Sequence, residues 1–424
     1  MRILIITRNA WDDTNAIGNT ISNFFGGVAD AEFAAIYFRS AMPNNPLCKK
    51  YYQTSEMEIM RKWFRPQLIG RRFCLTENHT ELGEHNARKE KKLIRLIQKY
   101  GSKLAYKLSD SLWYSKKWLN NNLDRFIEDF SPDVMFTFVR SAPQYYLVVN
   151  HIRKKYNIPL FTWIADDEYT LLEKKGRKKE IRNLHCILNE SAVICGCSQE
   201  ICDYYQSVFQ REATPLYKSC DFSLPVKSTI GDPITIVYAG NLLYGRLDII
   251  SRVADVVERI NAEGVSVSFE VFSNTSLLSH EEQLIFGGKE ATRYMGKRDY
   301  NFIKKRLSTA DIVLHVESFE EAEMQKTKYS FSTKIIDYLQ SGSVILAIGP
   351  KEISSMSYLS KVPGVVTINE VKNLAYDFKK LIADRDSFIQ RACAIRDYAY
   401  LHHGTKMVSK ILADVFNKTN DGGA

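Results

Sequence analysis

Short apolar runs rich in Val, Ile, Phe and Tyr alternate along the chain with longer segments in which apolar residues recur every three or four positions. The short runs predict strands and the longer segments predict helices, and this alternation is typical of parallel sheets flanked by helices. The runs that predict strands are Arg2–Thr7, Phe33–Phe38, Val134–Val139, Pro159–Ile164 and Ala192–Gly196, and then Ile234–Gly240, Val265–Phe272, Asp311–Val316 and Ser343–Ile348. The sequence therefore predicts an α/β protein with two doubly wound units in tandem.

The two series of strands are separated by a stretch between Pro215 and Pro233 that is rich in Ser, Pro, Gly and Asp and shows no sustained period. Such a stretch is a natural domain boundary. With 424 residues, the chain can form two domains that each bury a core. We expect a Rossmann-like domain over residues 1–222 and a second one over residues 223–397. Residues 398–424 are expected to form a helix that returns to the first domain.

The net charge of +9 comes from one segment of the chain. Residues 49–125 contain 18 Lys and Arg against 8 Asp and Glu, and we interpret them as a basic helical insertion. Basic residues interleaved with Trp and Phe suit an anionic membrane surface. One alternative is a set of solvated helix faces with the aromatic rings turned inward, and another is a nucleic-acid contact, for which no recognised module is present. The basic runs are Arg61–Arg65, Arg71–Phe73, Arg88–Lys92 and Trp113–Trp118.

The cellular location and the redox state follow from what the sequence contains near its start and along its length. The apolar run Arg2–Thr7 is too short for a signal peptide, and no apolar run reaches the ~18 residues that span a bilayer. We expect a cytoplasmic protein, with peripheral attachment to the inner membrane face. The eight cysteines are then expected to be reduced thiols. A zinc site at Cys195, Cys197 and Cys202 with His185 is an alternative, although this spacing fits no common zinc finger.

Candidate chemistry is expected after the strands, because open α/β sheets bind ligands beyond the carboxyl ends of their strands. In the second half, the strand ending at Ala239 is followed by Gly240, Asn241 and, at the start of a helix, Arg246. Backbone amides in such a glycine-bearing turn can approach a phosphate, and an arginine there can neutralise a diphosphate.

A second candidate site lies at the start of the helix that includes Ser332, Thr333, Lys334 and Asp337. Ser332 or Thr333 can cap this helix, which leaves free amides for an anion, and Lys334 in the first turn opposes the helix dipole unless an anion lies opposite. Asp337, one turn later, can accept hydrogen bonds from ribose hydroxyls. The alternative is an ordinary capped surface helix with solvated charges.

Two motifs in the second half resemble those of family-4 retaining GT-B glycosyltransferases. Tyr238-Ala239-Gly240-Asn241 with Arg246 resembles the family's glycine turn followed by arginine, and Ser332 to Leu346 resembles its Ser/Thr-Lys-x-x-Glu-Tyr-Leu block. Ser219-Cys220-Asp221 resembles the Asn-Gly-Val-Asp turn that these enzymes carry between domains. The resemblance covers residues 192–350 and is thin before them.

The resemblance implies a GT-B fold, with two Rossmann-like domains that face each other across a cleft. It implies that Arg246 and Lys334 bind the donor diphosphate, that Asp337 binds the ribose, and that the Gly240 and Thr333 backbones contact the phosphates. It also implies transfer with retention from a UDP- or GDP-linked sugar, with no cofactor and no essential metal, the two cations stabilising the leaving diphosphate.

The sequence departs from the family pattern at the first of its two carboxylates. Many members carry an acidic residue eight positions before the one at Asp337, and this chain has Tyr329 there. Glu317 and the nearby Glu320, Glu321 and Glu323 are candidates to replace it, and we include Glu317 among the donor-binding residues. Asp337 itself stands where the family usually has Glu.

In the first half, Gly18, Asn19 and Thr20 resemble the family's glycine-rich loop after the first strand, with an ordinary turn and cap as the alternative. Asp167 lies in the acidic cluster after the strand ending at Ile164, where a carboxylate can orient or deprotonate an acceptor hydroxyl. The alternative is that the cluster caps a helix. Arg140-Ser141 is a similar candidate after Val139.

The sequence therefore predicts a glycosyltransferase that moves a sugar from a nucleotide diphosphate to a lipid-linked or glycan acceptor, as in capsule or O-antigen assembly. Arg246, Lys334 and Asp167 are the expected catalytic residues. Two other functions are compatible with the same fold. One is a catalytically silent GT-B subunit, which the missing carboxylate favours, and the other is a sugar-nucleotide epimerase.

Overall fold

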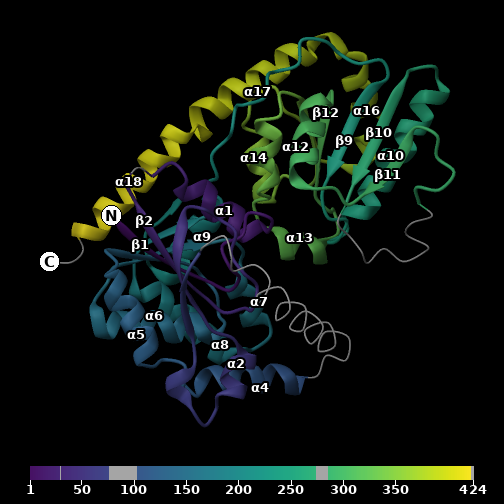
Figure 1. Ribbon diagram of the computed structural model, residues 1–424. Coiled ribbons are helices and arrows are strands. Elements are labelled where there is room, and N and C mark those ends of the chain that lie inside the picture. Colours follow the sequence, from purple (N-terminus) through teal and green to yellow (C-terminus); the bar gives the residue numbers. More distant parts are fainter. Residues whose placement is uncertain (29, 76–102, 274–284, 422–424) are drawn as a thin grey trace. The chain divides into compact units, whose positions relative to one another are not determined.

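The computed structural model describes residues 1–28, 30–75, 103–273 and 285–421 (Figure 1). The chain divides into two compact units, of which the first comprises Met1–Cys197, Cys202–Leu216 and Ser409–Ala424, and the second Ser198–Ile201 and Tyr217–Val408. The main change of unit thus falls after Leu216, where the sequence led us to expect residue 222. The return to the first unit falls at Ser409, where we expected residue 398.

The first unit is built on a sheet of eight strands, counted over the described residues, in the order β4-β3-β2-β1-β5-β6-β7-β8. All neighbouring pairs are parallel except β3 and β4. The order reverses between β1 and β5, which makes the carboxyl ends of these two strands the place where a ligand is expected. The strands are β1 (Arg2–Thr7), β2 (Glu32–Tyr37), β3 (Cys48–Gln53), β4 (Arg71–Cys74), β5 (Val134–Phe138), β6 (Leu160–Ile164), β7 (Ser191–Gly196) and β8 (Ala213–Pro215).

Helices cover this sheet, and their apolar residues form the core of the first unit with β1, β2 and β5. Phe416 in the last helix packs edge to face on Phe161 of β6, with 6.5 Å between ring centroids. The helices are α1 (Ala16–Phe25), α2 (Glu56–Arg61), η1 (Pro66–Leu68), α4 (Lys103–Tyr114), α5 (Asn121–Phe130), α6 (Pro143–Tyr156), α7 (Glu168–Lys174), α8 (Lys178–Glu190), α9 (Gln199–Phe209) and α18 (Thr405–Asp421).

The basic segment, residues 49–125, was expected to be a helical insertion, and its described part contains two strands, β3 and β4, besides the helices α2, α4 and the start of α5. Its first strand, β3, extends the sheet in parallel beside β2, and β4 then closes the edge in antiparallel pairing. Lys49 and Lys50 are exposed on β3 and Arg71 and Arg72 on the edge strand β4, because strands at the border of the sheet need only part of their side chains for the core. The run Arg88–Lys92 lies outside the described residues.

The second unit contains six parallel strands in the described residues, in the order β11-β10-β9-β12-β13-β14. The order reverses between β9 and β12, so this unit repeats the arrangement of the first. The strands are β9 (Ile234–Ala239), β10 (Val267–Phe272), β11 (Thr292–Gly296), β12 (Ile312–Val316), β13 (Val344–Ile348) and β14 (Val366–Ile368). All nine strands that the alternation predicted are present to within two residues of the expected bounds, and the predicted α/β class is confirmed.

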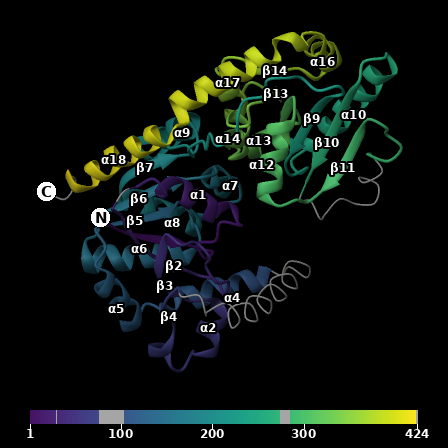
Figure 2. The same ribbon diagram turned by 45° about the horizontal axis from the view of Figure 1, so that its top comes forward.

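In the second unit, α10 lies along β10 and β11 and also packs on α16 (Figures 1 and 2). The buried face of α10 joins the inward residues of the strands in one apolar core. The helices are α10 (Arg246–Ala262), α12 (Tyr300–Thr309), α13 (Glu321–Thr327), α14 (Lys334–Leu339), α15 (Ser354–Leu359), η2 (Val371–Asn373), α16 (Leu374–Ala383), η3 (Arg385–Ser387) and α17 (Phe388–His403).

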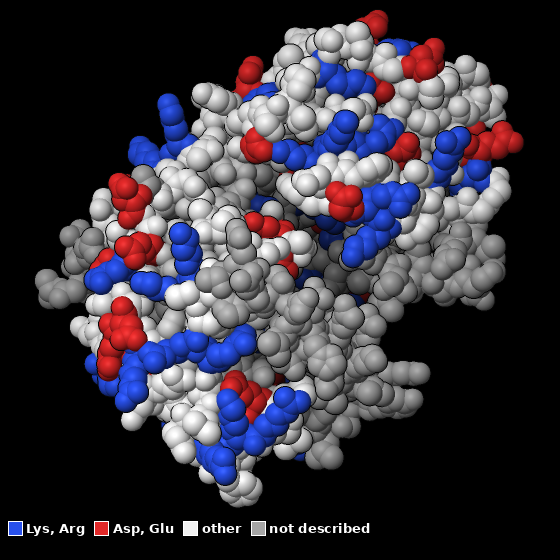
Figure 3. Space-filling view, in the orientation of Figure 1, with Lys and Arg blue, Asp and Glu red and all other residues white. Residues whose placement is uncertain are grey.

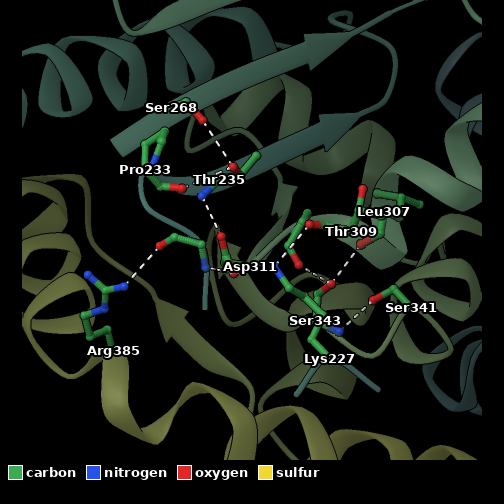
Figure 4. A network of polar contacts seen from close by, with 12 residues as sticks. Lys227, Pro233, Thr235, Ser268, Leu307, Thr309, Asp311, Ser341, Ser343 and Arg385 are labelled. Carbon is green, nitrogen blue, oxygen red and sulfur yellow. Dashed lines mark hydrogen bonds and ion pairs between the residues drawn. The ribbon is translucent and has the colours of Figure 1, made fainter. Parts of the chain in front are cut away.

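A buried carboxylate fixes the start of the second sheet (Figure 4). Asp311 is 2% exposed and accepts hydrogen bonds from Lys227 Nζ (2.5 Å), Gly231 N (3.0 Å) and Thr235 N (2.8 Å). The segment that enters β9 is thereby tied to the amino end of β12. Asp311, at the amino end of the strands, thus uses its hydrogen bonds to fix the chain. A ligand is expected at the opposite end of the sheet, beyond the carboxyl ends of the strands.

Candidate functional site

The predicted donor residues of the second unit gather where its strand order reverses. Gly240, Asn241 and Arg246 follow β9, and Glu317 follows β12 directly, so the carboxyl ends of two neighbouring strands supply them. This is the position at which open parallel sheets bind ligands. The structure thus brings Arg246 and Glu317 together from places 71 residues apart in the sequence.

The turn between β9 and α10 is held by its own backbone. Gly240 N donates to Phe272 O on β10 (3.0 Å), and the Tyr238 hydroxyl donates to Asn241 O (2.5 Å). Gly245, which precedes α10, has φ of 69°, and a Cβ at this position would lie 2.3 Å from Ser318 Oγ. Only glycine therefore allows the turn to place Arg246 at the first position of the helix.

Among the residues that the structure describes, three acceptors hold Arg246. Its Nε donates to Val316 O (3.1 Å), Nη1 donates to Asn241 Oδ1 (2.9 Å), and Nη2 donates to Glu317 Oε2 (2.8 Å). The side chain is 13% exposed. A guanidinium carries five N–H groups, so two remain for another acceptor in a side chain that is already oriented.

Glu317 is a partner of Arg246 rather than an exposed donor ligand. Its side chain is 3% exposed, and Oε1 lies 3.4 Å from His315 Nε2 and accepts from Ser355 Oγ at 3.3 Å. Burial acts to raise the pKa of this carboxyl group, but His315 and Arg246 outweigh it and hold the pKa below its usual range. Glu317 is therefore charged at neutral pH and fixes Arg246. Ser355 and His315, which no sequence signal marked, complete its surroundings.

Lys334 is the second cation of the site. It begins the short helix α14, whose first turn has Thr333 at its cap, and neither Ser332 nor Thr333 caps the helix with its side chain. This corrects the expected side-chain cap, since Thr333 has helical backbone angles and Ser332 instead accepts Ile335 N through its carbonyl. Within the part of the chain that the structure describes, the Lys334 ammonium makes no hydrogen bond or ion pair. Burial, and then repulsion from Arg246, lower the pKa of Lys334 to about 8.

Asp337 follows on α14, one turn after Lys334. Its Oδ1 accepts hydrogen bonds from the Tyr300 hydroxyl (3.0 Å) and Gln340 Nε2 (3.3 Å), and no bond to Oδ2 is present among the described residues. Burial raises the pKa of Asp337, and the nearby Lys218, which is 7% exposed, opposes that rise. Two donors orient one oxygen of this half-buried carboxylate. The other oxygen is therefore suited to accept a hydrogen bond from a hydroxyl group. Tyr300 and Lys218 had no signal in the sequence pattern.

The residues expected to form a glycine-rich loop lie in a helix instead. Gly18, Asn19 and Thr20 belong to the first turns of α1, because Asn15 caps this helix by accepting Gly18 N at 2.8 Å. The expectation of a loop is therefore wrong. Gly18 is needed for packing, since a Cβ would lie 2.1 Å from the carbonyl oxygen of Asp12.

The acidic cluster after β6 is engaged within the first unit. Asp167 caps α7 by accepting Thr170 N (3.1 Å), and Glu168 accepts from Ser141 N (3.0 Å) and from the Ser141 hydroxyl. Asp166 lies 3.5 Å from Arg140 Nη2. Asp167 Oδ1 therefore caps a helix, as one of the two interpretations of the cluster expected. That Asp167 Oδ2 orients or deprotonates the hydroxyl of a sugar acceptor stays a prediction.

The cysteines that suggested a zinc alternative are buried. Cys195 and Cys197 lie on or just after β7 and Cys202 on α9, and burial raises the pKa of the Cys202 thiol. In residues 1–28, 30–75, 103–273 and 285–421, no group of three or more His, Cys, Asp or Glu side chains is arranged to hold a metal ion. None of the helices in these ranges is both long and apolar enough to cross a membrane.

Comparisons with known proteins define the fold. No family model and no curated protein sequence matches the chain. Among solved structures, sucrose-phosphate synthase from Thermosynechococcus elongatus matches with a TM-score of 0.65 at 10% identity, over 100% of both chains. HepE (Alr3699) of Anabaena, solved with UDP and glucose, matches with a TM-score of 0.61 at 10% identity, over 98% of this chain and 99% of its own.

A third neighbour is WaaG, described as a glycosyltransferase involved in lipopolysaccharide biosynthesis. It matches with a TM-score of 0.59 at 10% identity, over 97% of this chain and 99% of its own. These neighbours are GT-B glycosyltransferases. The chain therefore has the GT-B fold, with two parallel-sheet α/β units, as the sequence predicted.

Proposed function

We propose that the protein is a glycosyltransferase that moves a sugar from a UDP- or GDP-linked donor to a lipid-linked or glycan acceptor, with retention and without an essential metal. The observation that carries the proposal is the pair of cations Arg246 and Lys334 beside the reversal point of the second sheet. Arg246 is fixed by Glu317 and keeps two N–H groups, and Lys334 is a half-buried ammonium with a lowered pKa of about 8. A diphosphate would relieve the repulsion between the two cations and accept their hydrogen bonds.

The chemistry of transfer follows from the same two residues. As the bond between sugar and diphosphate breaks, negative charge grows on the leaving phosphate oxygens. Two cations that are already in place stabilise that charge without having to reorganise. Asp337 would bind the ribose through Oδ2, and the Gly240 and Thr333 backbones would face the phosphates. Asp167 is the proposed group for the acceptor hydroxyl, through the oxygen that the helix cap does not use.

We further propose that the basic segment contacts an anionic membrane. No Asp or Glu occurs from Met60 to Cys74, and the exposed apolar side chains Met60, Phe64 and Leu68 lie among these basic residues, with Phe64 93% exposed. Figure 3 shows Lys and Arg gathered over the lower part of the view, where Figure 1 labels α2 and α4. Apolar side chains amid cations suit a bilayer interface. Trp113 and Trp118 are buried instead. Their burial agrees with the alternative interpretation, in which the aromatic rings of this segment turn inward.

A panel of UDP-, GDP- and TDP-sugars tests the donor proposal by thermal shift and by nucleotide release. At least one donor should stabilise the protein, and Lys334→Ala should abolish the shift. Lys361→Ala is the matched control, because Lys361 is an exposed lysine of the same unit with no side-chain bond in the described residues, and it should keep the shift. No stabilisation by any sugar nucleotide, UDP or GDP would contradict the proposal.

The same assay separates the two rival functions. An epimerase would convert or hydrolyse the donor when no acceptor is present. A catalytically silent subunit would bind the donor and release nothing when acceptors are added. A transferase releases the nucleotide only in step with an acceptor.

A further inference from the structure

Three arginines follow three neighbouring strands at the reversal point of the first sheet. Arg8 comes directly after β1, Arg39 two residues after β2, and Arg140 two residues after β5. β1 lies between β2 and β5, and the strand order reverses between β1 and β5. This is the counterpart, in the first unit, of the place where Arg246 stands in the second.

The register of the strands brings the three arginines to within one residue of a common level, with Arg39 and Arg140 one residue beyond Arg8. Thr7 pairs with Tyr37, and Ile6 pairs with Thr137, so β1, β2 and β5 end together. Beyond them, Phe38 N donates to Arg8 O at 3.1 Å. Neighbouring strands are ~4.8 Å apart, which is within the reach of arginine side chains toward one shared anion.

The hydrogen-bonding capacity of Arg8 and Arg140 is only partly used in the described part of the chain. Arg8 is exposed, and its guanidinium makes no hydrogen bond or ion pair in the described part of the chain. Arg140 lies 3.5 Å from Asp166, which is longer than the ~2.7–2.9 Å of a charge-assisted hydrogen bond, and Arg39 has Glu56 at 3.8 Å. Glu56 also accepts from Trp113 Nε1 (3.2 Å), and Glu168 is engaged by Ser141. Although Arg8 as a residue is exposed, partial desolvation of its guanidinium, and then the charges of Arg39 and Arg140, lower the pKa of Arg8.

We propose that Arg8 and Arg140, with the charge of Arg39 beside them, bind a phosphate or diphosphate group of the acceptor. A guanidinium fork matches phosphate oxygens in pairs, and several arginines suit a group with more than one negative charge. α6 adds to the attraction, because it begins three residues after Arg140 with no acidic residue in its first turn and no side-chain cap. The assignment of the bound group to an acceptor rests on the proposed transferase function. The existence of an anion site does not depend on that function.

The test measures inorganic pyrophosphate binding by calorimetry in the full chain carrying Lys334→Ala, which disables the proposed donor site. Arg8→Ala and Arg140→Ala are each added to this background and should weaken pyrophosphate binding about tenfold or more, the effect of losing charge-assisted hydrogen bonds. Arg140→Lys should restore only part of the affinity, since it keeps the charge and loses the fork. Arg182→Ala removes an exposed arginine of the same unit and should leave the affinity unchanged.

Two results would overturn the inference. Pyrophosphate could fail to bind the Lys334→Ala protein, or its affinity could be the same with and without Arg8 and Arg140, as with an adventitious ion only. Sugar-nucleotide stabilisation of Arg8→Ala and Arg140→Ala, in the protein with Lys334 intact, reports separately on the proposed function. Farnesyl diphosphate and glucose 1-phosphate in the same titration distinguish a lipid-linked acceptor from a soluble one by which of them binds more tightly than pyrophosphate.

Discussion

Arg246 Nη2 and Glu317 Oε2 lie 2.8 Å apart, with side chains only 13% and 3% exposed. A buried ion pair contributes little net stability by itself, but it is costly to break, because the remaining charge has no solvent to stabilise it. The pair thus holds one cation of the site in place, and Lys334 is a second cation that makes no hydrogen bond or ion pair with any residue that the structure describes. With Lys218 included, the site has three cations against the carboxyl groups of Glu317 and Asp337, so its net charge is positive and suited to an anion.

Removing Glu317 should destabilise the protein more than removing an exposed carboxylate. We expect Glu317→Ala to lower the free energy of unfolding by about 3–5 kcal/mol and Glu317→Gln by less, since the amide still accepts from Arg246. The pKa of Glu317 is below its usual range, so its stabilising effect is present at neutral pH and is lost as the pH falls through that lowered value.

Urea unfolding at neutral pH measures this effect, and Glu320→Gln, at an exposed position three residues on, is the control. A Glu317→Ala protein as stable as the control variant would mean that the ion pair does not hold Arg246.

Nucleotide affinity should fall as the pH rises through about 8. The pKa of Lys334 in the unliganded protein is about 8, and a bound diphosphate should raise it, so that binding above this pH takes up a proton. Stability without ligand should change in the opposite sense. The folded pKa lies below the ordinary value of 10.5, so stability rises as the pH rises between the two values.

Calorimetry of nucleotide binding in buffers of different ionisation enthalpy measures both affinity and proton uptake. Lys334→Arg is the control, because arginine stays protonated over this range and should remove the pH dependence of affinity. A wild-type affinity that is flat across about pH 7 to 9.5 would argue against Lys334 as a diphosphate ligand.

Substitutions of two glycines near the ends of α10 can distinguish the cost of backbone strain from the cost of steric crowding. Gly245 and Gly264 both have positive φ, of 69° and 89°, but a Cβ at Gly245 would meet Ser318 Oγ at 2.3 Å and one at Gly264 would meet nothing within 4 Å. We expect Gly264→Ala to cost about 1–2 kcal/mol of stability and no nucleotide affinity. Gly245→Ala should cost more stability and also weaken nucleotide binding, because Arg246 is the next residue. Equal effects of the two variants in thermal unfolding and binding would refute this account.

The exposed ring of Phe64 should govern membrane contact. We expect Phe64→Ser to reduce the fraction of protein that floats with anionic vesicles at low salt, and high salt to release the wild-type protein, because the attraction is screened. Tyr376→Ser is the control, since Tyr376 is an aromatic residue 72% exposed in the other unit. If neither salt nor Phe64→Ser changes flotation, or if the wild-type protein does not float, the membrane proposal falls.

The strands that could be predicted were those with a continuous apolar run. β1, β5 and β6 are buried along nearly their whole length, so almost every residue in them is apolar and the run of apolar residues indicates a strand. β3 and β4 could not be recognised in this way. Lys49 and Lys50 interrupt the alternation in β3, and β4 carries Arg71 and Arg72 toward solvent at the sheet edge. Strands at the border of a sheet do not need the apolar pattern that identifies a central strand, so the sequence of this segment predicts helices where β3 and β4 lie.

Individual residues of the candidate site could be predicted from the sequence, but the contacts between them could not. The sequence by itself determined that a glycine turn with Arg246 follows one strand and that Lys334 begins a helix, because turns and helix starts depend on residues close in the chain. Only the tertiary structure decided that Glu317 pairs with Arg246, and that Arg8, Arg39 and Arg140 emerge together. Both facts depend on which strands are neighbours in the sheet, and that order is set by packing between segments many residues apart.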